Sequence, residues 1–404
     1  FISVSFATKS LEVAVAALAH RLREQGGLLI ASVMVLFSLL GSTMGFSVET
    51  LGFYALFLPL MAALGYDRLV TAAMIILGAL VGVMGATVNP FSIGVAAGEA
   101  GVSIGDGIGL RVILWVVLTT IAVAWVLRYA ASVRRNPDAS LVGWDGDHAT
   151  PPAHDAGAGG LPRLTRTQKY VLAITAGAFG LMIFSVIPWS SVVGGSTAPA
   201  EDLLVHEVVG AQPFWFELNW WFPQLAMLFI FASILVGLVA RMGEKELVRL
   251  IAAGAADMMG PALVVLLAGG VSVIMTNTQT LDTILHSMER MVSGASAGFF
   301  AFLTILVNVP LAFLIPSSSG HGALAMPLLA PLADFAQVSR ATTITAWVAG
   351  HGLALMMAPT SVVLVGGLAI AKVGYDQYLR FVWPLLLALW LAATVIIGIA
   401  ATLG

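Results

Sequence analysis

The chain has 404 residues, of which 59% are hydrophobic and 10% charged, whereas an average soluble protein has roughly 25% charged residues. Most of its surface must therefore face lipid, and the composition predicts an all-α polytopic membrane protein rather than a soluble enzyme. The sequence contains no cysteine, which excludes disulfides and thiolate metal sites, and its net charge of −3 does not favour a nucleic-acid partner.

Apolar runs of spanning or near-spanning length occur throughout the chain. They are 29–40, 50–64, 69–86, 108–128, 170–188, 221–240, 259–275, 297–315, 322–335, 341–357 and 382–403. The first two runs, and the pair that flanks 316–320, are short for full crossings, and each pair meets at a small polar tip. Both pairs therefore predict re-entrant helical hairpins.

Two distant stretches repeat one pattern. GATVNPFSIGVAAGEAGVSIGDGIGLR begins at residue 85, and LMMAPTSVVLVGGLAIAKVGYDQYLR begins at residue 355. Aligning Pro90 with Pro359 also aligns Arg111 with Arg380 without a gap. Interrupted apolar segments that recur in both halves of a membrane protein indicate the binding site of a transporter.

The distribution of Lys and Arg predicts how the chain crosses the membrane. If the loop 129–169 is cytoplasmic, nearly all of these cations fall on the cytoplasmic side, provided that 29–64 and 297–337 each enter and leave on one side. The two hairpins then open to opposite sides, which predicts two inverted-topology repeats. The segment 189–218, rich in Gly and Ser and then in aromatic residues, is expected to be an exterior loop.

These patterns predict five parts of the chain. Residues 2–22 resemble 271–291, so the first repeat is expected to be N-terminally incomplete. The parts are 1–27 (incomplete first scaffold), 28–130 (transport half with the first hairpin), 131–167 (flexible cytoplasmic linker), 168–292 (second scaffold) and 293–404 (transport half with the second hairpin).

The two proline breaks predict a polar site at membrane depth. Each proline removes a backbone donor, and the half-helices that result offer free carbonyls to a cation and N-termini to a carboxylate. The predicted substrate-binding residues are Ser42, Thr43, Gly45, Glu49, Asn89, Pro90, Ser317, Ser318, Ser319, Gly320, His321, Pro359, Thr360 and Ser361. A sodium ion is expected at some of Thr43, Thr87, Asn89, Ser92, Ser318 and Thr360. The alternative is a pair of proline kinks whose hydroxyls bond back to the preceding helical turn.

Ionisable residues within the membrane segments have two interpretations each. Glu49 either pairs with a cationic group of the substrate or caps the helix that follows it. His321 is either a proton-sensitive ligand or a donor to hairpin carbonyls, and His351 is either an interhelical hydrogen-bonding residue or a proton relay.

The motifs ATVNPFSIG, LGYDRLV and PSSSGHGALAMPLLAPLAD resemble those of the YfcC-like transporters, which are related to the anaerobic C4-dicarboxylate carriers of the ion transporter superfamily. The resemblance covers nearly the whole chain apart from 136–165 and 189–218. It implies a homodimeric elevator-type carrier in the bacterial inner membrane, without a cofactor and coupled to Na⁺ or H⁺. The tips lack the Ser-Asn-Thr triplets of sodium-coupled relatives, which puts sodium in doubt.

The residues favour an amino acid as substrate, with a basic amino acid as the narrower hypothesis, moved by exchange or by ion coupling. No Lys or Arg lies at a tip or break to balance a second carboxylate, whereas Glu49 could balance an ammonium group. A carrier of C4-dicarboxylates or other carboxylates, coupled to sodium or protons, is the alternative. A remote one is an intramembrane hydrolase using Ser319 and His321, but the internal repeat would then have no explanation.

Overall fold

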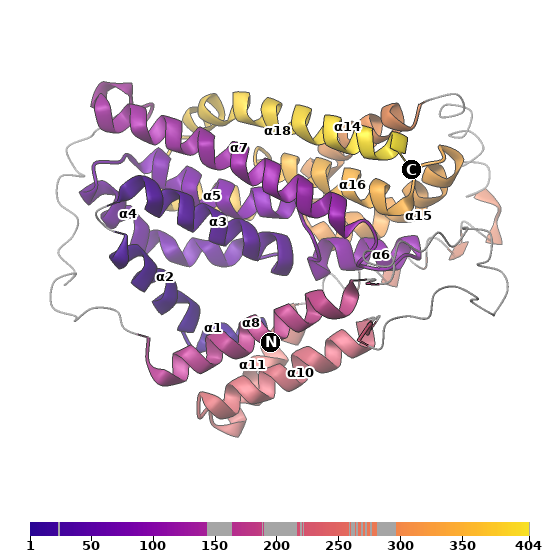
Figure 1. Ribbon diagram of the computed structural model, residues 1–404, viewed down its shortest axis with the longest axis horizontal. Coiled ribbons are helices and arrows are strands. Elements are labelled where there is room, and N and C mark those ends of the chain that lie inside the picture. Colours follow the sequence, from indigo (N-terminus) through magenta and orange to yellow (C-terminus); the bar gives the residue numbers. More distant parts are fainter. Residues whose placement is uncertain are drawn as a thin grey trace.

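The computed structural model describes residues 1–22, 25–143, 164–187, 189, 216–218, 220, 222–257, scattered positions from 259 to 280, and 296–403. All regular elements in these ranges are helical. The helices form two groups: a large bundle built from two stretches of chain and a smaller group packed beneath it (Figure 1). The segment 271–291, which the sequence aligns with the N-terminus, lies largely outside the described residues, as do most of 189–218 and 259–275.

The first stretch of the bundle contains seven elements. They are α3 (Gly26–Met44), η1 (Val48–Phe53), α4 (Tyr54–Ala63), α5 (Arg68–Met84), η2 (Pro90–Gly94), α6 (Val95–Ala100) and α7 (Ile108–Arg135). Helix α3 ends at Gly45, whose φ of 72° lies in the left-handed region that glycine adopts without strain. Helix α5 starts at Asp67, whose carboxylate accepts a hydrogen bond from Val70 N at 2.8 Å. Local capping chemistry therefore sets the hairpin tip and the start of α5.

The second stretch repeats this order of elements. It contains α14 (Ala297–Leu314), α15 (Ser318–Phe335), α16 (Arg340–Leu355), α17 (Val362–Ala371) and α18 (Tyr375–Leu403). Side-chain hydroxyls of Ser296, Ser317 and Ser339 cap α14, α15 and α16. Pro359 follows the end of α16, as Pro90 follows the end of α5, so both predicted breaks are present.

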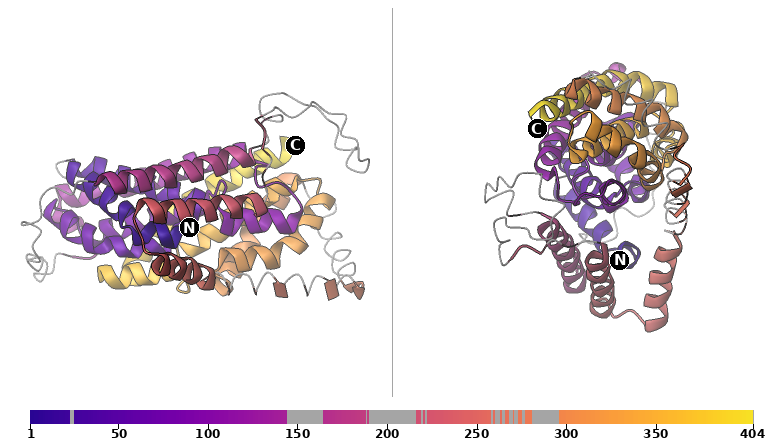
Figure 2. Two further views of the ribbon diagram at one scale, coloured as in Figure 1. Left: turned by 90° about the horizontal axis from the view of Figure 1, so that it is seen from below. Right: turned by 90° about the vertical axis from the view of Figure 1, so that its right-hand side faces the viewer.

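The smaller group lies along one side of the bundle (Figure 2). Its members are α1 (Ile2–Ala7), α2 (Ser10–Arg21), α8 (Arg166–Val186), α10 (Phe222–Val239) and α11 (Glu244–Asp257). Helix α8 packs on α10 and α2, and α1 packs on α10 and α11. Elements from the beginning and the middle of the chain thus come together outside the bundle.

Helices α5 and α16 form the centre of the bundle. Leu69–Met84 of α5 and Thr342–Leu355 of α16 are buried throughout, which explains why these runs lack a polar face. Two glycines allow α5 to pack closely on its neighbours. A Cβ on Gly352 of α16 would lie 2.4 Å from Met84 Cα of α5, and a Cβ on Gly82 of α5 would lie 2.1 Å from the Ser38 carbonyl oxygen of α3. Backbones this close leave room only for glycine.

The two stretches pack with matching partners. Helix α3 packs on α5 and α7, as α14 packs on α16 and α18. The second arm of each hairpin also contacts the other stretch, since α15 packs on η2 and α6 while η1 and α4 pack on α17. Each broken helix is therefore held by both hairpins.

Some boundaries differ from the sequence prediction. The first hairpin arm spans Gly26–Met44 rather than 29–40, and by length and composition both α3 and α14 are long enough to cross a membrane. Helix α7 continues to Arg135, beyond the predicted start of the linker at 131, and the short η3 (Pro137–Ala139) follows it. The last turn of α7 is polar because this end of the helix is solvated. A search for apolar runs does not detect a polar helix end, so the predicted helix stopped too early. The rest of the linker, 144–163, lies outside the described residues.

Candidate functional site

The first hairpin tip is hydrogen-bonded to the first break. Ser42 Oγ donates to the Gly85 carbonyl oxygen at 2.9 Å and to Thr87 Oγ1 at 3.0 Å. Thr87 N donates to the Ser42 carbonyl oxygen at 3.0 Å. All three residues are buried, so these bonds satisfy backbone groups that the end of α5 leaves without helical partners.

Asn89 shapes the turn beside this tip. Its Oδ1 accepts a hydrogen bond from Phe91 N at 2.9 Å, which starts η2 at Pro90. The side chain is 1% exposed and lies against Gly45, where a Cβ would approach Oδ1 to 2.9 Å. Ser92, in the same turn, is fully buried, and its hydroxyl has no hydrogen-bond partner in the part of the chain that the structure describes. The break thus brings an amide and an unpaired hydroxyl close to the tip.

The second tip is built differently, around two histidines. Ser318 Oγ lies 3.0 Å from His351 Nε2, and His351 Nδ1 lies 2.9 Å from His321 Nδ1. Only one of the two rings can carry a proton at Nδ1 in such a contact. Ser317 Oγ accepts a hydrogen bond from Gly320 N at 3.3 Å and lies 3.3 Å from Ser319 Oγ. The tip is therefore tied to α16 through His351.

Trp347 was not among the predicted residues, and His351, predicted to be an interhelical hydrogen-bonding residue or a proton relay, makes the interhelical hydrogen bond. The Trp347 ring stacks on His351 with centroids 5.8 Å apart, and it meets His321 edge-on at 5.7 Å. Both residues are fully buried. Their spacing of one helical turn, on a helix that precedes a proline break, is the sequence signal that would have placed them beside the tip.

The second break lacks the hydrogen bonds of the first. Thr360 Oγ1 donates to the Phe313 carbonyl oxygen at 3.0 Å, but Pro359 and Thr360 are exposed and Ser361 alone is buried. Tyr378 Oη donates to the Met356 carbonyl oxygen at 3.1 Å. A carbonyl that the break frees is thus satisfied by a tyrosine of α18. Each tip lies beside the break of its own stretch, and no hydrogen bond joins the two tips within the described ranges.

The residues predicted to hold sodium are spread over both tips and both breaks. Thr43 Oγ1 donates to the Leu39 carbonyl oxygen at 2.8 Å, which is the back-bonding arrangement of an ordinary membrane helix. A hydroxyl that gives its proton to the protein still has lone pairs for a cation. The sodium site therefore stays a prediction.

Glu49 is exposed at the start of η1. Its carboxylate accepts a hydrogen bond from Ser47 N at 3.1 Å, as expected for a helix-capping acid. Exposure also leaves this carboxylate accessible to a cationic group.

We expect the bonds between Ser42 and Thr87 to be energetically coupled. Ser42→Ala and Thr87→Val should each lower the free energy of unfolding. Because the two residues share one set of hydrogen bonds, the loss in the double variant should be smaller than the sum of the two single losses by about 0.5–3 kcal/mol. Thermal unfolding of the four purified proteins measures the coupling. Strictly additive losses would show that the two residues act independently.

Comparison with known proteins identifies the family. The model of the C4-dicarboxylate anaerobic carrier family, DcuC, matches residues 1–402. The chain belongs to this family. It is an integral multi-pass membrane protein of the bacterial inner membrane, and it is a transporter rather than an enzyme.

Two curated relatives of this DcuC-family chain are each 28% identical to it. One is an uncharacterized protein of Haemophilus influenzae, aligned over 98% of this chain and 72% of the relative. The other, from Escherichia coli, carries the provisional name basic amino acid antiporter YfcC and aligns over 98% of this chain and 74% of its own length. The resemblance to YfcC-like transporters is therefore confirmed.

Two solved structures share the fold. The YdaH transporter of Alcanivorax borkumensis superposes with a TM-score of 0.68 at 16% identity, over 98% of this chain and 82% of YdaH. MtrF of Neisseria gonorrhoeae is described as belonging to a class of antimetabolite efflux pumps. It superposes with a TM-score of 0.56 at 17% identity, over 96% of this chain and 80% of MtrF.

Proposed function

We propose that this DcuC-family protein is a secondary active transporter that moves an amino acid, with a basic amino acid favoured. The charge of the site carries the proposal: both tips and both breaks lack Lys and Arg, whereas Glu49 is an accessible carboxylate next to the first tip. The substrate carboxylate would accept hydrogen bonds from the Asn89 amide and from backbone N–H groups at the start of α15. Glu49 would balance the substrate's ammonium or guanidinium group.

The two groups of helices support an elevator mechanism. The bundle of α3–α7 and α14–α18 would be the transport domain, and α1, α2, α8, α10 and α11 would belong to the scaffold, as predicted for 28–130 with 293–404 and for 1–27 with 168–292. The matching helix pairs support two inverted repeats with re-entrant hairpins. A homodimer would hold the scaffold still, and Na⁺ or H⁺ would drive uptake unless the protein exchanges one amino acid for another.

A carboxylate carrier is the second candidate, because the family model is that of C4-dicarboxylate carriers. The two candidates lead to different expectations at Glu49, because this carboxylate would repel a dicarboxylate substrate but attract a basic amino acid. The charge preference of the site therefore separates the two candidates.

Glu49→Gln is expected to weaken lysine and arginine transport by about 5- to 150-fold and to change neutral amino acids little, since a charge-assisted hydrogen bond is lost. The glutamine amide oxygen can still accept from Ser47 N, so the cap survives. Uptake and exchange of labelled lysine, alanine and succinate by proteoliposomes measure the effect, with Glu12→Gln, an exposed residue of α2, as the matched control. Transport of succinate alone, or its improvement in Glu49→Gln, would establish the carboxylate carrier instead.

A further inference from the structure

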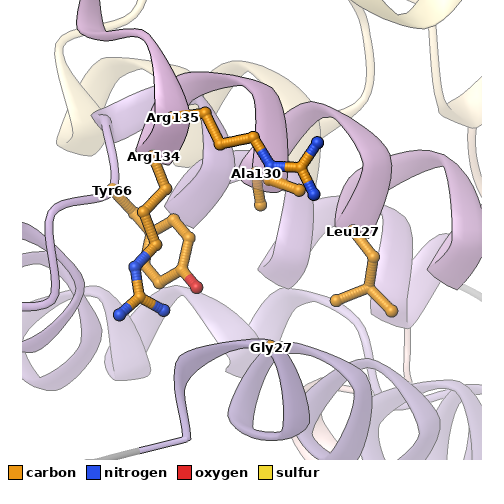
Figure 3. A pocket seen from close by; sticks show the side chains of 7 residues that line it. Gly27, Tyr66, Leu127, Ala130, Arg134 and Arg135 are labelled. Carbon is orange, nitrogen blue, oxygen red and sulfur yellow. The ribbon is translucent and has the colours of Figure 1, made fainter.

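An amphipathic pocket lies at the end of α7, far along the chain from the tips. Its volume is about 540 Å³, and it opens between the start of α3, the turn before α5 and the last turns of α7 (Figure 3). Its lining includes Gly27, Tyr66, Leu127, Ala130, Arg134 and Arg135.

Two guanidinium groups without acidic partners border this pocket. Arg134 lies over the Tyr66 ring at 5.9 Å, which orients it beside the opening, and Arg135 follows it on α7 (Figure 3). Neither arginine makes an ion pair with any residue in the described ranges. The nearby carboxylate of Asp67 is already used, because it accepts hydrogen bonds from Val70 N, Tyr129 Oη and Ser140 Oγ. The arginines thus retain their donors for an external anion.

The depth of the pocket suits a lipid headgroup. Helix α7 has 28 residues, which at 1.5 Å per residue gives about 42 Å, more than the roughly 30 Å of a hydrocarbon core. Its arginine-bearing end must therefore reach the headgroup layer, where Tyr66 and Tyr129 also fit. Ala130 and Leu127, about one and two turns deeper than Arg134, provide an apolar wall that an acyl chain can cover.

We propose that this pocket binds the phosphate of an anionic phospholipid, with Arg134 and Arg135 as donors and the acyl chain along Leu127 and Ala130. A guanidinium group matches phosphate geometry, and basic pockets between membrane helices bind anionic headgroups. Because Gly27 lies in the first turn of α3, a bound lipid bridges α7 and the arm that carries the first tip. A free phosphate would satisfy the arginines but not the apolar wall.

Native mass spectrometry of the detergent-purified protein with phosphatidylglycerol, phosphatidylcholine or inorganic phosphate tests the proposal. Wild type should bind phosphatidylglycerol about 10-fold more tightly than phosphatidylcholine, and Arg134→Gln/Arg135→Gln should remove that preference. Gly27→Leu keeps both charges but fills the pocket, since a Cβ there meets only Leu127 at 3.9 Å, and should also weaken lipid binding. Arg128→Gln, exposed on the same helix outside the pocket, should leave it unchanged.

Three results would overturn the proposal. An equal loss in Arg128→Gln would show diffuse surface charge, and unchanged binding by Gly27→Leu would show that the pocket is not used. Competition by inorganic phosphate at the lipid's own concentration would identify a soluble phosphate as the ligand. Thermal unfolding of each variant without added lipid should match wild type, and an arginine variant that unfolds earlier is replaced by the alanine variant at the same positions, which also removes the charges.

Discussion

Asn89→Ala is expected to lower substrate affinity by about 5- to 150-fold, the equivalent of losing a buried polar contact of about 1–3 kcal/mol. Asn89 lies at the junction of the first tip and the first break, where it is 1% exposed and adjoins Gly45. Its Oδ1 is used by Phe91 N, so the amide NH₂ is the group available to a substrate carboxylate. Binding measured by thermal shift against substrate concentration gives the affinity.

A control must separate binding from folding, because the alanine also removes the cap of η2. Asn89→Asp retains an oxygen that can accept from Phe91 N, yet it lacks the amide donor and adds a negative charge. The unfolding temperature of Asn89→Asp should therefore be closer to that of wild type than the unfolding temperature of Asn89→Ala is. Asn89→Asp should nevertheless bind an anionic group as weakly as Asn89→Ala does, or more weakly. Normal uptake by both variants would remove Asn89 from the site.

Gly82→Ala is expected to destabilise the protein by about 1–3 kcal/mol or more, because the new methyl group has no space. Its Cβ would lie 2.1 Å from the carbonyl oxygen and 2.8 Å from Cα of Ser38, and backbone atoms in the middle of α3 cannot rotate away. Helices α3 and α5 would have to separate, which would also pull Ser42 from Thr87. A lower midpoint of thermal unfolding and reduced transport should appear together.

Gly177 on α8 provides the matched control. It is exposed, and a Cβ there would meet no atom within 4 Å. Gly177→Ala should leave the unfolding midpoint unchanged or raise it slightly, since alanine favours a helix by up to about 1 kcal/mol over glycine. If both glycine variants behaved alike, the close approach of α3 and α5 would not limit stability.

The compartment, the family and the two breaks could be predicted from the amino-acid sequence alone. A chain this apolar must lie in lipid, and a proline that follows a buried helix cannot continue it, so Pro90 and Pro359 were recognisable without coordinates. Capping is equally local: Gly45, Asp67 and Ser317 set helix ends through groups only a few residues away. These features depend on neighbours along the chain, which a sequence shows directly.

Which polar groups meet depends on how the helices pack against one another, and the sequence does not show this. The bonds from Ser42 to Thr87, and from Ser318 through His351 to His321, join separate helices, and the rotation of one helix against another is fixed by packing rather than by spacing. Thr87 and Met356 are equivalent in the repeat, yet Thr87 bonds to a tip while the Met356 carbonyl accepts from Tyr378 on α18. Close contacts such as that between Gly82 and Ser38 restrict these rotations, because two helices whose backbones touch can pack in few orientations.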